Sequence, residues 1–438
     1  MPQPALPEPA HADLDSMLAR KFGKEVANYF SGSPLNRVGF LRNDHTFLSS
    51  ALRHPSTSFL LCNNLQPLIS ERSKLAYVKH DDVKSIIGED PYNQPEDQLI
   101  EQYNSTKFIP QMIFLGLDER VRGQLTYKGH SGAPYFAVDV TPQKSLTDAC
   151  NTLISKLESQ GLTFAQGRAM DLVASDGKPP LSRPKAPSLP LTQPLAAIYA
   201  EARQLLDWNL RNPFCAQCGQ PTLSINGGFK RTCPPADLAK LSSTAQATTA
   251  EIPLPNIAER APCATRKGVS NLSFPRTDPT VIMAVVNAAS THILLGRQKR
   301  WPEFWYSTLA GFCEPAESIE EAVRREVWEE AGVKLGRVVI HSTQPWPYPA
   351  NLMIGAIGQA VPGEGEKIDL GNDPELEDAR WFSYEEVREA LRVGTSGLGE
   401  DAGPGYKEGG LRLPPSTAIA NQLMTAVVSG FVSAEPKM

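Results

Sequence analysis

GFCEPAESIEEAVRREVWEEAGV, which occupies residues 311–333, is the stretch that decides the fold of this chain. Ser318 is followed three residues later by Glu321, the pattern of a capping box that begins a helix. Gly332 is placed to end the same helix, because glycine favours the left-handed conformation found just past helix ends. Apolar residues recur between these signals at helical spacing and predict a face packed on a core: Ile319, Ala322, Val323 and Val327.

The same helix carries clustered carboxylates. Glu326 and Glu330 are four residues apart and therefore lie one turn above each other, with Glu329 at the border of their face. Arg325, four residues before Glu329, can steady that carboxylate. Clustered carboxylates repel one another, but a divalent cation such as Mg²⁺ reverses the penalty because it prefers oxygen ligands. An acidic, solvated helix face is the alternative interpretation, and the complete spacing of glycines, arginine and glutamates favours a metal site.

The complete string resembles the Nudix box. This resemblance implies a hydrolase of nucleoside diphosphates linked to another group, with an α/β/α sandwich whose loop–helix–loop holds metals. It implies that Glu326, Glu330 and the carbonyl of Ala310 bind Mg²⁺ or Mn²⁺, and that Glu329 is a further ligand or the base that activates water. Metal-activated water attacking phosphorus is then a sufficient mechanism. The defining positions of the box are Gly311, Glu317, Arg325, Glu326, Glu329, Glu330 and Gly332.

A second unusual segment, TQPWPYPAN, occupies residues 343–351. Its prolines alternate with aromatic residues, so the chain is stiff here and loses little entropy when a ligand binds. Trp346 and Tyr348 can stack on a flat ring or wall its pocket, and a rigid edge or dimer strand is the alternative. The segment resembles the SQPWPFPxS signature of NADH pyrophosphatases, from which it departs at Thr343, Tyr348 and Asn351.

The resemblance to that subfamily implies cleavage of NAD(H) to NMN(H) and AMP, removal of NAD caps from RNA, and a homodimer. It also implies that Phe274 lies at the substrate base and that Ala420 contacts the substrate. Glu375 would be a further metal ligand, with Glu377 as its competitor, since strand alternation would place both on one face. The segment itself would supply the substrate-binding residues Gln344, Pro345, Trp346, Pro347, Tyr348, Pro349, Ala350 and Asn351.

Four of the seven cysteines fall in one part of the chain, at Cys215, Cys218, Cys233 and Cys263. A CxxC pair followed by Gly219 is what a zinc-ribbon knuckle needs, because the glycine lets the chain turn around the metal. Residues 234–262 separate the second pair and are expected to loop out and return. A redox CxxC or unrelated buried thiols are the alternative; four thiolates would hold one structural Zn²⁺ per chain. The remaining cysteines are expected in cores: Cys62, Cys150 and Cys313.

A length of 438 residues predicts two or three domains. The expected fold class is α/β (α+β), with an N-terminal Nudix-like domain, a zinc ribbon and a C-terminal Nudix sandwich. Short apolar runs predict strands at 58–62, 112–117 and 135–140, and helical periodicity predicts helices at 145–157 and 160–174. The predicted parts are a leader (1–12), an NADH-pyrophosphatase-like domain (13–176), a Pro-rich linker and helix (177–210), the ribbon (211–272), the Nudix domain (273–432) and a tail (433–438).

The C-terminal part adds three expectations. Residues 281–286 and 293–295 read as a hairpin, and residues 416–428 as a last helix. By resemblance, the N-terminal domain is a degenerate Nudix relative used in dimerisation. The ending Pro436-Lys437-Met438 resembles a variant of a peroxisomal address, so a peroxisomal or cytoplasmic location is expected.

Composition sets the outer limits of function. Hydrophobic residues make up 41% and charged residues 21%, which argues against general disorder. The net charge of −5 provides no global basic field, so long RNA is a less obvious partner than a free dinucleotide. No apolar run approaches the length of a membrane-spanning helix, and the first residues lack the features of a secretory signal.

Three functions remain open at this point. An NAD(H) diphosphatase is favoured. A Nudix diphosphatase for ADP-ribose or dinucleoside polyphosphates is the second, and the segment at 343–351 argues against it. A catalytically inactive zinc-ribbon protein that binds RNA or its cap is the third, and the intact glutamates argue against that one. Preference between NADH, NAD and capped RNA is left open, as is the number of catalytic metals.

Overall fold

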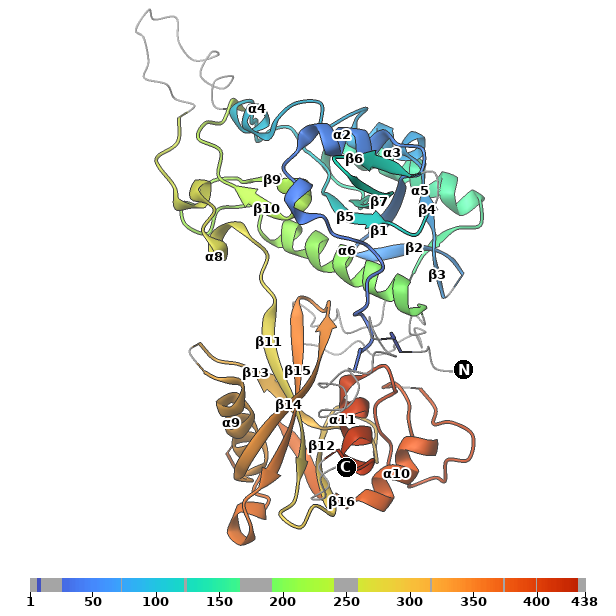
Figure 1. Cartoon of the computed structure of the whole chain (residues 1–438), viewed down its shortest axis with the longest axis vertical. Helices are drawn as coiled ribbons and strands as arrows, with labels where there is room; N and C mark the ends of the chain where they lie inside the picture. Colours follow the sequence, from blue (N-terminus) through green and yellow to red (C-terminus); the bar gives the residue numbers. More distant parts are fainter. Residues whose placement is uncertain are drawn as a thin grey trace, which may run out of the picture. The chain divides into compact units, whose positions relative to one another are not determined.

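The computed structural model describes residues 6–8, 26–71, 73–121, 124–165, 191–239, 259–315, 317–372, 375–398 and 400–431. It divides into two compact units (Figure 1). One comprises Ser33–Gly167 and Ile198–Arg276; the other comprises Met1–Gly32, Arg168–Ala197 and Thr277–Met438. Most of the leader (1–12) and residues 177–190 of the predicted linker and helix lie outside the described residues. The ending Pro436–Met438 lies outside them too, so the predicted location stays a prediction.

The unit that contains the N-terminal domain is built on one sheet with the strand order β3-β2-β1-β7-β5. β1 and β7 are parallel, and the neighbouring pairs β1–β2 and β5–β7 are antiparallel. The strands are β1 (Ser58–Asn63), β2 (Gln66–Glu71), β3 (Lys74–Leu75), β4 (Tyr77–Val78), β5 (Met112–Asp118), β6 (Leu125–Tyr127), β7 (His130–Asp139) and β8 (Thr163–Phe164). The helices are η1 (Gly39–Leu41), α2 (His45–Arg53), α3 (His80–Ile87), α4 (Glu96–Glu101), η2 (Lys144–Leu146), α5 (Thr147–Ser159) and α6 (Gln193–Arg211).

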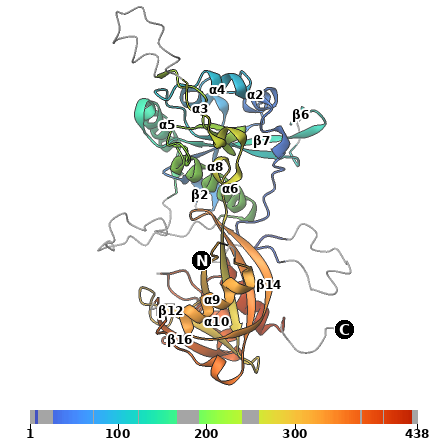
Figure 2. The same ribbon diagram turned by 90° about the vertical axis from the view of Figure 1, so that its left-hand side faces the viewer.

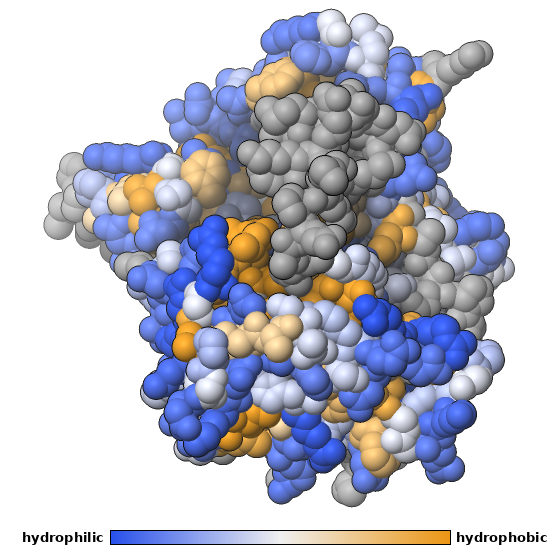
Figure 3. Space-filling model, turned by 60° about the horizontal axis from the view of Figure 1, so that its bottom comes forward, coloured by the Kyte–Doolittle hydropathy of each residue, from blue (hydrophilic) through white to orange (hydrophobic). Residues whose placement is uncertain are grey.

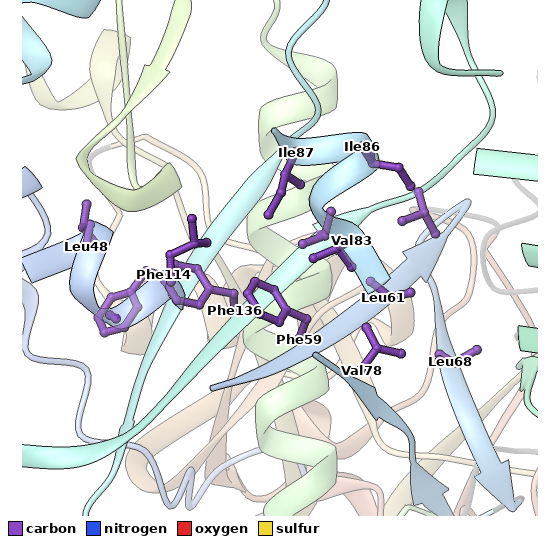
Figure 4. Close-up of a cluster of buried hydrophobic side chains, with 14 of the residues drawn as sticks. Leu48, Phe59, Leu61, Leu68, Val78, Val83, Ile86, Ile87, Phe114 and Phe136 are labelled. Atoms are coloured by element: carbon purple, nitrogen blue, oxygen red, sulfur yellow. The ribbon is translucent and has the colours of Figure 1, made fainter. Parts of the chain in front are cut away.

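Aromatic rings form the centre of this unit's core (Figure 4). Phe59 and Phe136 stack with their ring centres 5.5 Å apart, and Phe114 meets Phe136 edge-on at 5.3 Å. Such rings contribute most of the apolar area that a sheet and its helices can bury. The three strands predicted here are confirmed as β1, β5 and β7, and two of the cysteines expected in cores are buried: Cys62 and Cys150.

The helix predicted over 160–174 is wrong in its described part. α5 ends at Ser159, and Gly161 has a φ of 81°, the left-handed conformation that ends helices. Phe164 then pairs with Leu68 of β2, so the chain has already become a strand. Residues 166–174 lie outside the described residues.

The other unit is an α/β/α sandwich around a sheet with the order β14-β15-β11-β12-β16 and with β13 paired to β11. β11 and β15 are parallel, and the pairs β11–β12 and β14–β15 are antiparallel, which confirms the predicted hairpin. The strands are β11 (Asp278–Val286), β12 (His292–Gln298), β13 (Leu309–Phe312), β14 (Leu335–Trp346), β15 (Asn351–Ala360) and β16 (Leu376–Ser383). The helices are α9 (Ile319–Ala331), η6 (Gly363–Glu366), α10 (Tyr384–Val393) and α11 (Ile419–Val428).

Each face of this sheet buries its own core. Alternate residues of β11 point to opposite faces, as strand geometry requires. Val281, Met283 and Val285 pack toward α9. Ile282, Ala284 and Val286 pack toward α10 and α11, which cover the other face in Figure 1. α9 lies on the face of the sheet turned to the viewer in Figure 2.

The described helices include none that is both long and apolar enough to cross a bilayer. The surface in Figure 3 is mostly hydrophilic, with separate hydrophobic patches. Large apolar residues that are exposed include Phe312, Trp328 and Ile340.

Candidate active site

α9 begins and ends where the sequence places it. The Ser318 hydroxyl accepts a hydrogen bond from the Glu321 amide, and the Glu321 carboxylate accepts one from the Ser318 amide, which completes the capping box. Gly332 closes the helix with a φ of 70°, and its N–H donates to the carbonyl of Trp328. Val323 and Val327 are fully buried, so they fix which face of α9 is left for the glutamates.

The glutamates of α9 differ in exposure. Glu330 is 5% exposed, Glu326 is half-buried, and the Glu329 side chain is 37% exposed. Burial raises the pKa of Glu326; Arg325 opposes that shift, whereas the charges of Glu329 and Glu375 add to it. The charges of Glu329, on α9, and of Glu375, immediately before β16, therefore both act on Glu326, the situation that a divalent cation relieves.

Gly311 lets β13 pass directly against Glu326. A methyl group in place of its hydrogen would overlap the Glu326 carboxylate. Ala310, the neighbouring residue, pairs with Ile282 of β11, so the sheet fixes the position of its backbone. The box requires glycine at this position because a strand and a charged side chain approach each other closely here.

Arg325 connects the loop and the helix through all five of its N–H groups. Nε and Nη2 donate to the two carboxylate oxygens of Glu317, and Nη2 donates also to the carbonyl of Phe312 at 2.9 Å. Nη1 donates to Glu326 at 2.8 Å and to Glu329 at 2.9 Å. The sequence predicted the contact with Glu329 but missed the one with Glu317, to which Arg325 makes its bidentate contact.

The structure separates Glu375 from Glu377. Glu377 forms an ion pair with Arg297 at 2.6 Å, whereas the charge of Glu375 acts on Glu326. A β-bulge in the pairing of β12 with β16, between Arg297 and Gln298, interrupts the simple alternation expected there. Of the two, Glu375 is therefore the residue whose charge acts on a glutamate of α9.

Residues 343–351, which we call the aromatic segment, include the end of β14 and lead into β15. The ring centres of Trp346 and Tyr348 are 5.5 Å apart with an interplanar angle of 65°, and both side chains are partly exposed. The amide of Asp278, at the start of β11, donates to the carbonyl of Ala350. The next residue, Pro279, accepts a hydrogen bond from the amide of Cys313, in the loop before α9. The aromatic segment and the loop before α9, which we call the Nudix loop, therefore meet at one end of β11.

Gln344 has a structural role in the described chain. Its side chain is 1% exposed, and its amide donates to the carbonyls of Tyr29 and Thr417 and accepts from the amide of Ile419. These partners occupy both donors and the acceptor. The remaining residues of the segment are Pro345, Pro347, Pro349, Ala350 and Asn351, all at the hairpin end, and Asn351 begins β15.

Two further residues are expected from the sequence to contact substrate, Ala420 and Phe274. Ala420 belongs to α11, is 3% exposed and packs in the core that α10 and α11 form with the sheet. Phe274 belongs to the unit that contains the ribbon, where Lys230 lies 5.5 Å from its ring centre. α11 itself begins at Ile419, three residues after the expected start, with Ala418 as its N-cap.

The predicted zinc ligands come together in the other unit. All four sulfurs lie within 4.8 Å of one another, with 3.5 Å separating Cys215 from Cys263 and Cys218 from Cys233. Tetrahedral Zn–S bonds of about 2.3 Å place sulfurs about 3.8 Å apart, whereas a disulfide needs about 2.0 Å. The geometry therefore fits one structural zinc ion. Within the described residues, these four cysteines are the one group of acidic, histidine or cysteine side chains found close enough together to hold a metal ion.

Short elements position these thiols. Gly219 has a φ of 70° and donates to the carbonyl of Cys215, which forms the first knuckle. Cys233 follows the hairpin of β9 (Leu223–Ile225) and β10 (Lys230–Thr232). Cys263 precedes η5 (Ala264–Lys267), which leads to α8 (Ser270–Ser273). Burial, and then the neighbouring thiols, raise the pKa of Cys233 to about 12, so a cation is needed to keep this group ionised.

The ends of the ribbon insertion meet, as expected. The amide of Arg260 donates to the carbonyl of Pro235 at 2.7 Å, and Ala236 and Glu259 form a β-bridge. The guanidinium of Arg260 forms a fully buried ion pair with Asp237 at 2.6 Å. Residues 240–258 lie outside the described residues.

The sandwich and the box helix define a Nudix hydrolase, and comparisons with known proteins agree. The NUDIX domain matches residues 276–398, an NADH pyrophosphatase-like rudimentary NUDIX domain matches 56–208, and an NADH pyrophosphatase zinc ribbon matches 210–238. The chain therefore belongs to the NADH pyrophosphatase branch of the Nudix family. The ribbon match ends before Cys263, so the structure supplies the fourth thiol.

Several named relatives align over most of the chain. An NAD-capped RNA hydrolase of Schizosaccharomyces pombe is 32% identical over 93% of this chain and 95% of its own length. Human NAD-capped RNA hydrolase NUDT12 is 33% identical over 92% of this chain and 73% of its own length. Human mitochondrial NAD(P)H pyrophosphatase NUDT13 is 32% identical over 52% of this chain and 54% of its own length.

Proposed function

We propose that this protein hydrolyses the pyrophosphate bond of NAD(H) to give NMN(H) and AMP, and that it removes NAD caps from RNA by the same reaction. The observation that carries the proposal is the meeting of two surfaces at one end of β11. The loop before α9 hydrogen-bonds to β11 through Cys313 and Pro279, and the aromatic segment does so through Ala350 and Asp278. Gly311 of β13, just before that loop, lies against the carboxylate of Glu326 on α9. A dinucleotide needs both, because it has a charged pyrophosphate and flat rings on either side.

We propose Mg²⁺ or Mn²⁺ as the catalytic cofactor. Glu326, Glu330, Glu375 and the carbonyl of Ala310 would hold it, and the close approach at Gly311 leaves the Glu326 carboxylate fixed against the sheet. When bound, such a cation would supply a more acidic water and neutralise the negative charge that develops on the phosphoryl and leaving-group oxygens. The crowding that raises the pKa of Glu326 supports a cation site among these groups.

Glu329 is suited to accept the proton of the attacking water. Its side chain is the most exposed of the three on α9, and one N–H of Arg325 holds it in place. Arg325 would also keep Glu326 ionised, because a neighbouring cation favours the carboxylate form. Trp346 and Tyr348 would stack against a base or nicotinamide ring, which orients the pyrophosphate toward the carboxylates.

We propose in addition that the protein is a homodimer. β14 is an edge strand in the described sheet, and its residues Val339 and Ile340 are 38% and 49% exposed. Apolar residues on an edge strand favour pairing with another chain. Sedimentation equilibrium of the purified protein tests this; a monomer at all concentrations would reject it.

The decisive test of the activity is a product assay. Purified protein is incubated with Mg²⁺ or Mn²⁺ and, in separate reactions, NADH, NAD, ADP-ribose, a dinucleoside polyphosphate and NAD-capped RNA, and kcat/KM values are compared. We expect NMNH or NMN plus AMP, with NAD(H) or NAD-capped RNA as the best substrate. ADP-ribose or a dinucleoside polyphosphate as the best substrate would favour the second Nudix activity, and no hydrolysis of any substrate would favour a binding protein.

A further inference from the structure

Residues 28–30, which we call the N-terminal strap, pack against the beginning of the aromatic segment. Asn28 is 1% exposed, and its amide donates to the Ser342 hydroxyl at 3.1 Å and to the Thr343 carbonyl at 2.9 Å. These partners are 314 and 315 residues away along the chain. The strap is therefore a tertiary element of the Nudix unit.

The strap is fixed from both sides. The Gln344 amide donates to the carbonyl of Tyr29 at 3.0 Å. The Tyr29 hydroxyl, on a side chain 5% exposed, donates to the carbonyl of Leu191 at 2.8 Å. Buried hydrogen bonds of this kind specify one position of the backbone, because each unpaired group would be costly.

Phe30 is the residue that this arrangement presents to the aromatic segment. Its φ of 73° lies in the left-handed region, which a bulky side chain adopts only where its surroundings enforce it. The ring centre lies 6.0 Å from that of Trp346 and 6.2 Å from that of Tyr348, with interplanar angles of 78° and 68°. Each of the three rings thus meets the other two edge-to-face.

We propose that Phe30 is a positioning residue for substrate binding: it sets the tilt of Trp346 and Tyr348, the two rings that stack on the dinucleotide. This inference rests on the proposed function of those rings. Edge-to-face contact fixes the plane of a ring while leaving part of its surface free, and both rings remain partly exposed. Loss of Phe30 would let the rings reorient, and binding would then have to restore their order.

The test compares Phe30→Ala, Phe30→Tyr and Phe40→Ala in NADH hydrolysis at saturating metal. Phe40 is 65% exposed and contacts His130 in the other unit, so its removal controls for the loss of a phenyl ring. We expect Phe30→Ala to raise KM about tenfold with kcat within about twofold, and Phe30→Tyr to restore KM. Phe40→Ala should behave as wild type. Should Phe30→Ala fail to fold, Phe30→Leu takes its place.

A second readout does not depend on turnover. In protein labelled with 5-fluorotryptophan, the resonance of Trp346 is identified by its loss in Trp346→Phe. Phe30→Ala should shift this resonance without substrate, and Phe40→Ala should not. An unchanged KM, an equal fall in kcat, or an unmoved Trp346 resonance would overturn the proposal. A wild-type protein that does not cleave NADH would instead reject the proposed function, while the fluorine spectrum still tests the ring contact.

Discussion

The guanidinium of Arg325 donates two hydrogen bonds to the carboxylate of Glu317, from Nε to Oε1 at 2.6 Å and from Nη2 to Oε2 at 2.9 Å. This pair joins the helix to the loop before it, eight residues earlier in the chain. It also holds the pKa of Glu317 down, at about 2, chiefly through the hydrogen bonds from Arg325. The loop and the glutamates of α9 are consequently one rigid assembly.

Arg325→Lys should reduce kcat/KM by about a hundredfold or more, because an ammonium group cannot form the bidentate contact and reach three other acceptors at once. Arg324→Lys is the matched control, since Arg324 hydrogen-bonds only to the carbonyls of Gly336 and Glu320 among the contacts described. Steady-state kinetics on both variants decides the matter. Equal activity of the two would show that the Arg325 network is not needed.

Glu330→Gln should lower kcat by about a thousandfold or more while leaving the fold intact, since it removes one ligand charge and keeps the side-chain volume. Glu320→Gln, on the same helix, should retain activity. Circular dichroism and NADH turnover are measured for both. A fully active Glu330→Gln would refute the assignment of this glutamate to the metal site.

Gly311→Ala should abolish hydrolysis, because the new methyl group overlaps the Glu326 carboxylate and must displace it. Gly336→Ala is the control: its added carbon would meet only the Gln359 carbonyl, at an ordinary contact distance of 3.7 Å. We expect a loss of at least about a hundredfold in kcat/KM for the first variant and little change for the second. Unimpaired turnover by Gly311→Ala would contradict the close approach.

Elemental analysis should find about one zinc per chain, and Cys263→Ser should lose it. The thermal midpoint of that variant should fall by at least about 5 °C, because a structural zinc site contributes directly to folding. Cys150→Ala, a buried cysteine of α5, should keep its zinc. Zinc retained in full by Cys263→Ser would show that the fourth ligand is another group.

The raised pKa of Glu201 should make the stability of the folded protein depend on pH. This carboxyl group lies on α6, 3.5 Å from the Nε of Arg37, and burial raises its pKa from 4.5 to about 7 even though Arg37 and Arg42 oppose the shift. The folded state therefore holds this proton more tightly than the unfolded state does. Its stabilising contribution is complete below pH 4.5 and is lost as the pH rises through 7.

Glu201→Gln should remove that dependence. At pH 8 the variant should be more stable than wild type by up to roughly 3 kcal/mol, since one pKa step corresponds to about 1.4 kcal/mol. Urea midpoints at pH 5 and pH 8 measure the effect, and Glu158→Gln, on the exposed face of α5, is the control. A wild-type midpoint that does not fall between these pH values would contradict the shift.

Local signals in the sequence predicted α9 almost to the residue. Its capping box and its terminal glycine act within one helical turn, so they are visible without tertiary structure. The same holds for the knuckle at Gly219. The failed helix at 160–174 shows the limit, because the pairing of Phe164 with Leu68 depends on a strand almost one hundred residues earlier.

The features of the site that the sequence did not predict depend on contacts between residues far apart in the chain. The hydrogen bonds of Asn28 to Ser342 and Thr343 join residues more than 300 positions apart, and no periodicity signals such a contact. The bulge at Glu377 depends on how β12 and β16 pair. Phe274 and Ala420 were assigned by resemblance alone, and their roles stay predictions.

The ion pair between Arg260 and Asp237, which we call the clasp, joins the two ends of the ribbon insertion. The geometry of the zinc ligands therefore does not depend on how long the insertion is. Because the two ends are already joined, the entropy of closing the loop beyond them grows only slowly with its length. Residues between 239 and 259 are therefore the natural place to attach an affinity tag or a fluorescent domain. The four thiols would keep the surroundings that the clasp gives them, so the labelled protein should retain its zinc.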